Sequence, residues 1–230
     1  MTLWVFGDSF SIPHNYQHEK LWKYDTNWIK ELQTKLNISE VQTFVEFGVS
    51  NEWIFKHAIE NAGNFQQDDY VIFQLTNADR HWFFEDKPAE SNLVQLNNPN
   101  WDKNQTKAVE YYLKYLYNDN FNDIVYSSII YSLMYIQSAR PDVKVLILPG
   151  WGAAPKVNGN LVHCVSDPEF TNKDVIKKFY EKTGFDPRLN HMTIDNHYIL
   201  SNKIAEYFTT GQMLDLTSGF KSNIYTEENI

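Results

Sequence analysis

Short apolar runs alternate along this chain with longer segments in which apolar residues recur every three or four positions. Four apolar runs rich in Val, Ile, Phe and Leu predict strands at 2–6, 41–47, 70–76 and 143–148. Helical periodicity predicts helices near 26–36, 52–62, 107–139, 171–182 and 194–209. Because predicted strands alternate with predicted helices, we expect parallel βαβ units and a sheet covered on both faces.

Polar residues and a proline mark the ends of several predicted helices. Asp25-Thr26 is a candidate cap for the first helix, and Thr193 is a candidate start for the last one. Pro141 ends the long helix and leads into the apolar strand at 143–148.

The length of 230 residues favours one α/β domain, which we assign to residues 1–211. The segment 85–106 is polar, rich in Asn and punctuated by proline, so it is predicted to be an insertion loop that acts as a lid or a binding loop. Residues 212–230 lack a clear periodicity and are assigned to a C-terminal tail.

Charge and hydropathy argue against a nucleic-acid-binding protein and against a membrane-spanning one. The net charge of −9 argues against a nucleic-acid-binding surface, which needs a basic patch. No stretch of eighteen apolar residues is present, so we expect no membrane span. Asp8 interrupts the first apolar run, which leaves no room for a signal peptide, and we therefore expect a cytoplasmic protein.

The single cysteine, Cys164, excludes an internal disulfide and a multi-cysteine metal site. It lies within the apolar run 161–165, where a cysteine usually acts as a small hydrophobic residue. His14 and His18 are four residues apart, but Pro13 and the lack of a nearby acidic pattern argue against a metal site there.

The first predicted strand runs directly into Gly7-Asp8-Ser9. Such a turn places a serine hydroxyl at the carboxyl edge of the sheet, where open α/β folds hold their ligands. Three further polar motifs follow along the chain: Phe47-Gly48-Val49-Ser50-Asn51, Gln74-Leu75-Thr76-Asn77 and Asn190-His191-Met192-Thr193.

In their order and spacing these four motifs resemble the four blocks of the SGNH (GDSL-like) hydrolase family, which are named for Ser, Gly, Asn and His. Ser9, Gly48, Asn77 and His191 match the four blocks in order. The resemblance implies a three-layer α/β/α sandwich of flavodoxin-like type, with a mainly parallel central sheet. It also implies a serine esterase that needs neither a metal nor an organic cofactor.

Ser9 is the expected nucleophile and His191, in the turn before the last helix, the expected base. His197 lies inside that helix and is expected to be a packing or surface residue. The family carries Asp three residues before its histidine, but Arg188 stands there and the nearest upstream acid is Asp186. Two models stay open: a Ser9–His191–Asp186 triad, and a dyad whose histidine is oriented by a backbone carbonyl.

The oxyanion hole implied by the resemblance combines the backbone amides of Ser9 and Gly48 with the side-chain amide of Asn77. The family's third motif reads Gly-x-Asn-Asp, whereas this chain has Leu75-Thr76-Asn77-Ala78. Only the Asn of that motif is retained.

Arg80 and Trp82 follow Asn77 and are candidate substrate-binding residues. The expected substrate is a small-molecule or glycan ester, with an O-acetyl or other O-acyl group on a carbohydrate as the first choice. One alternative is a non-catalytic glycan- or protein-binding module that retains the fold. A flavodoxin-like nucleotide binder is disfavoured, because Gly7 alone makes no glycine-rich phosphate loop. The sequence leaves the oligomeric state open.

Overall fold

The computed structural model describes residues 1–12, 27–82, 101–164, 192 and 194–221. Contacts divide the chain into two units. The first contains Leu3–Ser9 and Gln42–Ile147, and the second contains Phe10–Val41 and Leu148–Ile230.

A four-stranded sheet in the order β2-β1-β3-β4 forms the centre of the first unit. Its strands are β1 (Thr2–Gly7), β2 (Glu40–Val45), β3 (Tyr70–Leu75) and β4 (Lys144–Pro149). β1 and β3 are parallel, and their register pairs Leu3 with Tyr70 and Phe6 with Phe73. All six residues of β3 are buried, which explains why this strand is apolar apart from Gln74 and shows no alternation.

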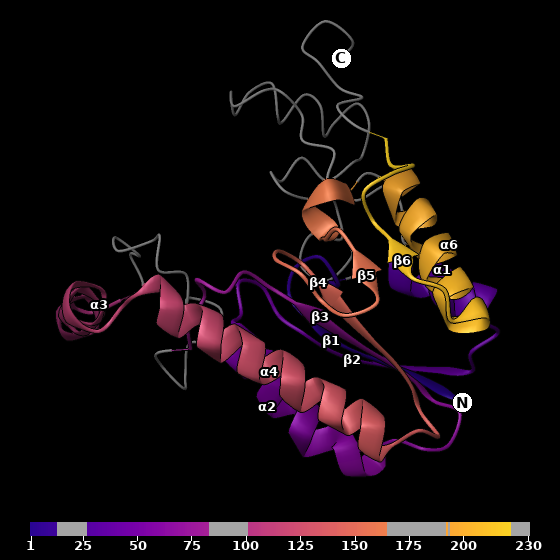
Figure 1. Cartoon of the computed structure of the whole chain (residues 1–230), viewed down its shortest axis with the longest axis horizontal. Helices are drawn as coiled ribbons and strands as arrows, with labels where there is room; N and C mark the ends of the chain where they lie inside the picture. The colour runs from indigo at the N-terminus through magenta and orange to yellow at the C-terminus, as the bar shows by residue number, and fades with distance from the viewer. Residues whose placement is uncertain (13–26, 83–100, 165–191, 193, 222–230) are drawn as a thin grey trace, which may run out of the picture. The chain divides into compact units, whose positions relative to one another are not determined.

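Helices accompany this sheet within the first unit: α2 (Asn51–Asn61), the 3-10 turn η1 (Ala62–Asn64), α3 (Lys103–Tyr115) and α4 (Asp119–Ala139). α2 and α4 run side by side (Figure 1). The four predicted strands and the predicted α/β class with a mainly parallel central sheet are thus confirmed, and the arrangement is compatible with an α/β/α sandwich.

The prediction of one long helix over 107–139 is wrong. The chain forms α3 and α4 instead, with a break at 116–118. The amides of Leu116 and Tyr117 both donate to the carbonyl of Tyr112, which ends α3. The Asn118 side chain then accepts the Phe121 amide at 2.8 Å and caps the start of α4. The predicted loop 85–106 lies mostly outside the described residues, and its last part, from Lys103, is the first turn of α3.

The second unit contains α1 (Trp28–Lys35), β5 (Val157–Asn158), the 3-10 turn η3 (Leu161–Cys164), α6 (Ile194–Thr210) and β6 (Leu214–Asp215). α1 is capped by Asn27, whose side chain accepts the amides of Ile29 and Lys30. The predicted caps Asp25 and Thr26 lie outside the described residues, as does the predicted helix at 171–182. Part of the predicted tail is ordered, because β6 pairs with β5 in parallel.

α1 and α6 pack against each other in the second unit, and His197 of α6 holds them together. Its side chain is buried, and its Nδ1 accepts the backbone amide of Trp28 at 3.3 Å. The indole of Trp28 in turn donates to the carbonyl of Phe10. His197 is therefore a packing residue.

Cys164 is buried at the end of η3. Burial raises the pKa of its thiol far above the ordinary range, so the thiolate that nucleophilic chemistry needs is not formed at neutral pH. Among the described helices, none combines the length and the apolar character needed to cross a bilayer.

Candidate functional site at the carboxyl edge of the sheet

Three of the predicted site residues follow neighbouring strands of the first unit. Ser9 follows β1, Gly48 follows β2 and Asn77 follows β3. The parallel register of β1 and β3 brings the carboxyl ends of these strands to one edge. The amide of Glu46 donates to the carbonyl of Gly7 at 3.3 Å, which places the end of β2 beside the end of β1. The edge predicted from the sequence is therefore formed.

Asp8, the residue before Ser9, is fully buried and fixes the turn that carries the serine. Its backbone amide donates to Oε1 of Gln74 at 2.9 Å. Its carboxylate oxygen Oδ2 accepts the Thr76 hydroxyl at 2.7 Å and Nη1 of Arg80 at 2.8 Å. The carboxylate thus joins the end of β1 to the loop after β3, and it is a structural anchor of the Ser9 turn.

Arg80 takes part in this anchor through the same nitrogen that binds Asp8. Nη1 also donates to the Thr76 hydroxyl oxygen at 2.7 Å, so the three side chains form one closed cluster. The Arg80 side chain is only 16% exposed. Its backbone amide donates to the carbonyl of Asn77 and closes the turn after β3. These contacts give Arg80 a structural role, and its predicted role in substrate binding stays a prediction.

Gly48 has a φ of +66°, in the left-handed region that residues with a side chain rarely adopt. The turn leads into α2, where Ser50 is the N-cap. The next residue, Asn51, is buried and hydrogen-bonds to the backbone at the end of β3. Its Oδ1 accepts the Thr76 amide at 2.8 Å, and its Nδ2 donates to the Thr76 carbonyl at 3.1 Å. The turn after β2 and the end of β3 are therefore fixed to each other.

Asn77 is half-buried, and its side chain is oriented by a bond to its own loop. Its Oδ1 accepts the amide of Asp79 at 3.0 Å. The part of the chain that the structure describes makes no hydrogen bond to its Nδ2. Within the described residues, Nδ2 of Asn77 is thus available to donate a hydrogen bond to an oxyanion. The Asp79 amide holds Oδ1 of the same side chain in place.

The loop after β3 is tied to the start of α4 through Asp79. Its Oδ1 accepts the Tyr117 hydroxyl at 3.1 Å and Nδ2 of Asn122 at 3.3 Å. Desolvation and the Asp79 carboxylate raise the pKa of Tyr117 to about 12, so this hydroxyl stays a donor at neutral pH. The loop that carries Asn77 is therefore held at both of its ends.

A carboxylate–imidazole pair lies next to this edge. Nδ1 of His81 is 3.2 Å from Oε1 of Glu52, in the first turn of α2, and its ring packs edge-on against Tyr112. Burial raises the pKa of the Glu52 carboxyl, but its bonds to His81 and the Ser50 hydroxyl outweigh that effect, and the pKa lies below its ordinary value. The pair fixes the loop after β3 to the start of α2.

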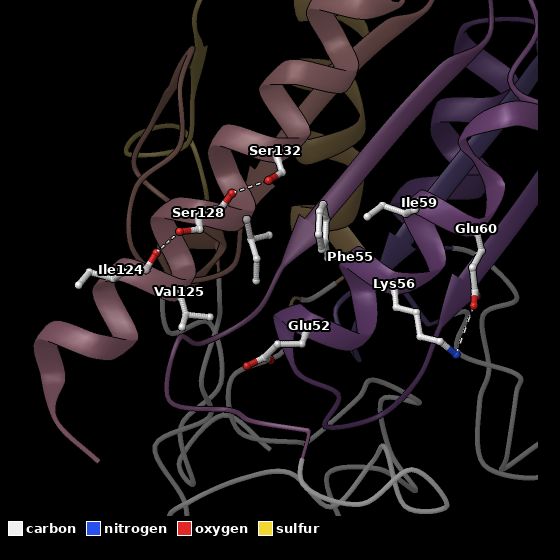
Figure 2. Close-up of a pocket in the computed structure, with 10 residues that line it drawn as sticks. Glu52, Phe55, Lys56, Ile59, Glu60, Ile124, Val125, Ser128 and Ser132 are labelled. Carbon is white, nitrogen blue, oxygen red and sulfur yellow. Dashed lines mark hydrogen bonds and ion pairs between the residues drawn. The ribbon is translucent and has the colours of Figure 1, made fainter. Parts of the chain in front are cut away.

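A cavity of about 630 Å³ lies between α2 and α4. Figure 2 shows side chains of both helices that line it. Apolar side chains dominate its walls, among them Phe55, Ile59, Val125 and Ile129. None of the predicted site residues lines it. Trp82 lies near its rim, because the Lys56 ammonium, which lines the cavity, is 5.3 Å from the centre of the Trp82 ring. Through Glu52, which lines it, the cavity borders the polar edge, but its walls do not include Ser9, Gly48 or Asn77.

The structure brings Ser9, Gly48 and Asn77 to one edge, whereas His191 and Asp186 lie outside the described residues. Gln74, Asn51 and Thr76 were not predicted as site residues, although all three belong to the polar motifs at the ends of the strands. Polar residues directly at strand ends are the signal that would have found them. Within the described residues, no group of three or more His, Cys, Asp or Glu side chains is arranged to hold a metal ion.

No protein-family model matches the chain, and the search of curated proteins finds no match. The resemblance to SGNH hydrolases therefore rests on the four sequence motifs alone.

Proposed function

We propose that this protein is a serine hydrolase of the SGNH type that cleaves an ester, with an O-acyl group on a carbohydrate as the first substrate class to test. One observation carries the proposal. Ser9, Gly48 and Asn77 stand at neighbouring strand ends, on turns fixed by buried polar contacts, and no group within the described residues accepts a hydrogen bond from Nδ2 of Asn77.

In the proposed mechanism, the hydroxyl oxygen of Ser9 attacks the acyl carbonyl while His191 accepts its proton. The negative charge that develops on the carbonyl oxygen is stabilised by the backbone amides of Ser9 and Gly48 and by Nδ2 of Asn77. His191 then gives the proton to the leaving alcohol. A water molecule, deprotonated by His191, attacks the acyl-enzyme, releases the acid and restores Ser9.

The rigid turns explain how such a site would work without a mobile assembly step. Stabilisation of the oxyanion depends on donors that are already in place when the charge develops. Asp8, Thr76 and Arg80 hold the serine turn, and Asn51 holds the end of β3 against the Gly48 turn. These contacts support the proposal, because they would hold the donors in place before the charge develops.

A fluorophosphonate probe tests the proposal directly, because it labels only a serine activated by a base. We expect the wild-type chain to be labelled and Ser9→Ala to be unlabelled. Ser127→Ala is the matched control, since Ser127 is an exposed serine on α4. Labelling of Ser9→Ala at the wild-type rate would remove Ser9 from the mechanism. Absence of labelling and of turnover with aryl and sugar esters in the wild type would favour a non-catalytic binding module.

A further inference from the structure

The longest helix, α4, carries a row of exposed residues with the spacing of a coiled-coil seam. The row comprises Phe121, Ile124, Ser128, Tyr131, Tyr135 and Ser138, which we call the α4 seam. Successive members are three or four residues apart in strict alternation, as at the a and d positions of a heptad. The four large side chains are 47%, 63%, 71% and 74% exposed, in chain order.

The opposite face of α4 packs against the rest of the first unit. Asn122, Ile129 and Leu133 are the buried residues of the helix. Nε2 of Gln137 donates to the carbonyl of Val145 in β4 at 3.2 Å and fixes the end of the helix to the sheet. The seam is therefore a second apolar face, in addition to the one that builds the core.

Exposure of this kind is unusual. Three aromatic rings and an isoleucine on one helix face form an apolar stripe of the sort that marks an interaction site. The seam carries no charged side chain, and neither do the positions that flank it, Val125, Ser127, Ser132 and Met134. A partner that buries this face therefore needs an apolar surface without unpaired charges.

The seam is complementary to itself when two copies of α4 run antiparallel. A two-fold axis midway between Ser128 and Tyr131 places Phe121 opposite Ser138 of the partner subunit. The same axis places Ser128 opposite Tyr131 of the partner subunit, and Ile124 opposite Tyr135 of the partner subunit. In four of the six resulting layers a bulky ring faces a serine, which lets the two helices approach closely. A two-fold interface must match itself in this way.

We propose that two copies of this chain form a two-fold dimer through antiparallel contact of their α4 seams. The antiparallel orientation also opposes the two helix dipoles, which is the favourable arrangement. From Phe121 to Ser138 the seam is about 25 Å long at 1.5 Å per residue. No charged group has to be buried when it closes.

The size of the contact sets the expected strength. Aromatic side chains bury about 150–250 Å² each, so the exposed parts of the four large residues supply on the order of 400 Å² per subunit. A stable interface needs roughly 600 Å² or more per subunit. The difference has to come from residues beside the seam, such as Ile59 of α2, which is 53% exposed and lines the same apolar cavity as Ile124 and Ser128 (Figure 2). We therefore expect a dimer of moderate affinity.

Sedimentation velocity over a range of protein concentrations tests the proposal. We expect the wild type to reach twice the 27.1 kDa chain mass as concentration rises. Tyr131→Glu should raise the dissociation constant at least tenfold, because it places two carboxylates near the two-fold axis. Tyr111→Glu is the matched control: Tyr111 lies on α3, is 64% exposed and is outside the seam. Its dimer should be unchanged, and circular dichroism confirms that both variants are folded.

Cross-linking tests the antiparallel orientation. In the proposed dimer Phe121 and Ser138 of the partner subunit are adjacent, whereas two copies of Phe121 are about 25 Å apart. A short bismaleimide should therefore join Phe121→Cys to Ser138→Cys in a mixture, and join neither variant to itself. The wild type, whose Cys164 is buried, provides the background. A monomeric wild type, equal effects of the two glutamate variants, or cross-linking of Phe121→Cys to itself would each overturn the proposal.

Discussion

Removal of the Arg80 guanidinium is the most direct perturbation of the candidate site. Arg80→Met keeps most of the length and apolar stem of the side chain but leaves the Asp8 carboxylate, which is fully buried, without its cation. The Thr76 hydroxyl at 2.7 Å still donates to the carboxylate but brings no positive charge. Breaking a buried ion pair from one side costs about 3–5 kcal/mol of stability, because the other charge stays buried.

For a chain of this size, 1 kcal/mol changes the melting temperature by about 2–4 °C, so Arg80→Met should lower it by roughly 6–20 °C. Denaturant unfolding monitored by circular dichroism measures the free energy itself. Lys56→Met is the control, because the Lys56–Glu60 pair at 3.3 Å is about half exposed on both sides. Such a surface pair contributes less than about 1 kcal/mol.

A double-mutant cycle separates the ion pair from general packing effects. Once Asp8 is replaced by Asn, no buried charge is left, so adding Arg80→Met to Asp8→Asn should cost much less than Arg80→Met alone. Loss of the anchor should also slow fluorophosphonate labelling of Ser9, since the turn is no longer fixed. The reasoning is refuted if Arg80→Met costs no more than Lys56→Met, or if the two substitutions at the pair are additive.

Three further predictions address the chemistry and its surroundings. Asn77→Ala should lower kcat by about 10²–10³-fold with little change in KM, the usual effect of losing one oxyanion donor; a change in KM alone would make Asn77 a substrate-binding residue. Asp186→Asn should lower turnover by orders of magnitude and shift the pH–rate profile if Asp186 orients His191; a loss of less than about tenfold, with His191→Ala inactive, would leave the dyad. Because the Glu52 carboxyl has a lowered pKa when folded, it stabilises the protein above its ordinary value of 4.5, and this stability is lost as the pH falls through the folded pKa. Thermal melts should therefore show Glu52→Gln less stable than wild type at pH 7, by a difference that shrinks as the pH falls below 4.5; a difference that is the same at every pH would contradict this.

The sheet could be predicted from the sequence because its signal is local. The central strand β3 is a buried run of six residues between polar turns, and a fully buried strand is mostly apolar. Its polar residue Gln74 is hydrogen-bonded at both ends of its side-chain amide. The break between α3 and α4 has a weaker signal. Leu116 and Tyr117 continue the apolar periodicity, so the sequence pattern predicts one continuous helix. The N-cap role of Asn118 therefore could not be recognised from that pattern.

The strand pair β5–β6 could not be predicted from the sequence, for a different reason. Each strand has two residues, and a period of two cannot be recognised over that length. Burial of Leu214 and Leu216 nevertheless orders this part of the chain, since it removes apolar surface from water. Pairing between residues 57 positions apart has no local signature in the sequence.

For the candidate site, the sequence predicted which residues follow the strands but not what holds them. Asp8 and Arg80 are 72 residues apart, and neither neighbourhood indicates the other. A buried carboxylate is costly unless a cation and hydrogen-bond donors reach it. Because Asp8 is buried at the end of β1, its carboxylate needs a cation and hydrogen-bond donors. The loop after β3 supplies them through Arg80 and Thr76. The same contacts that satisfy this buried charge also fix the turn of Ser9 and the loop of Asn77. The stability of the fold and the geometry of the proposed site are therefore coupled through one ion pair, and variants at Arg80 should change both together.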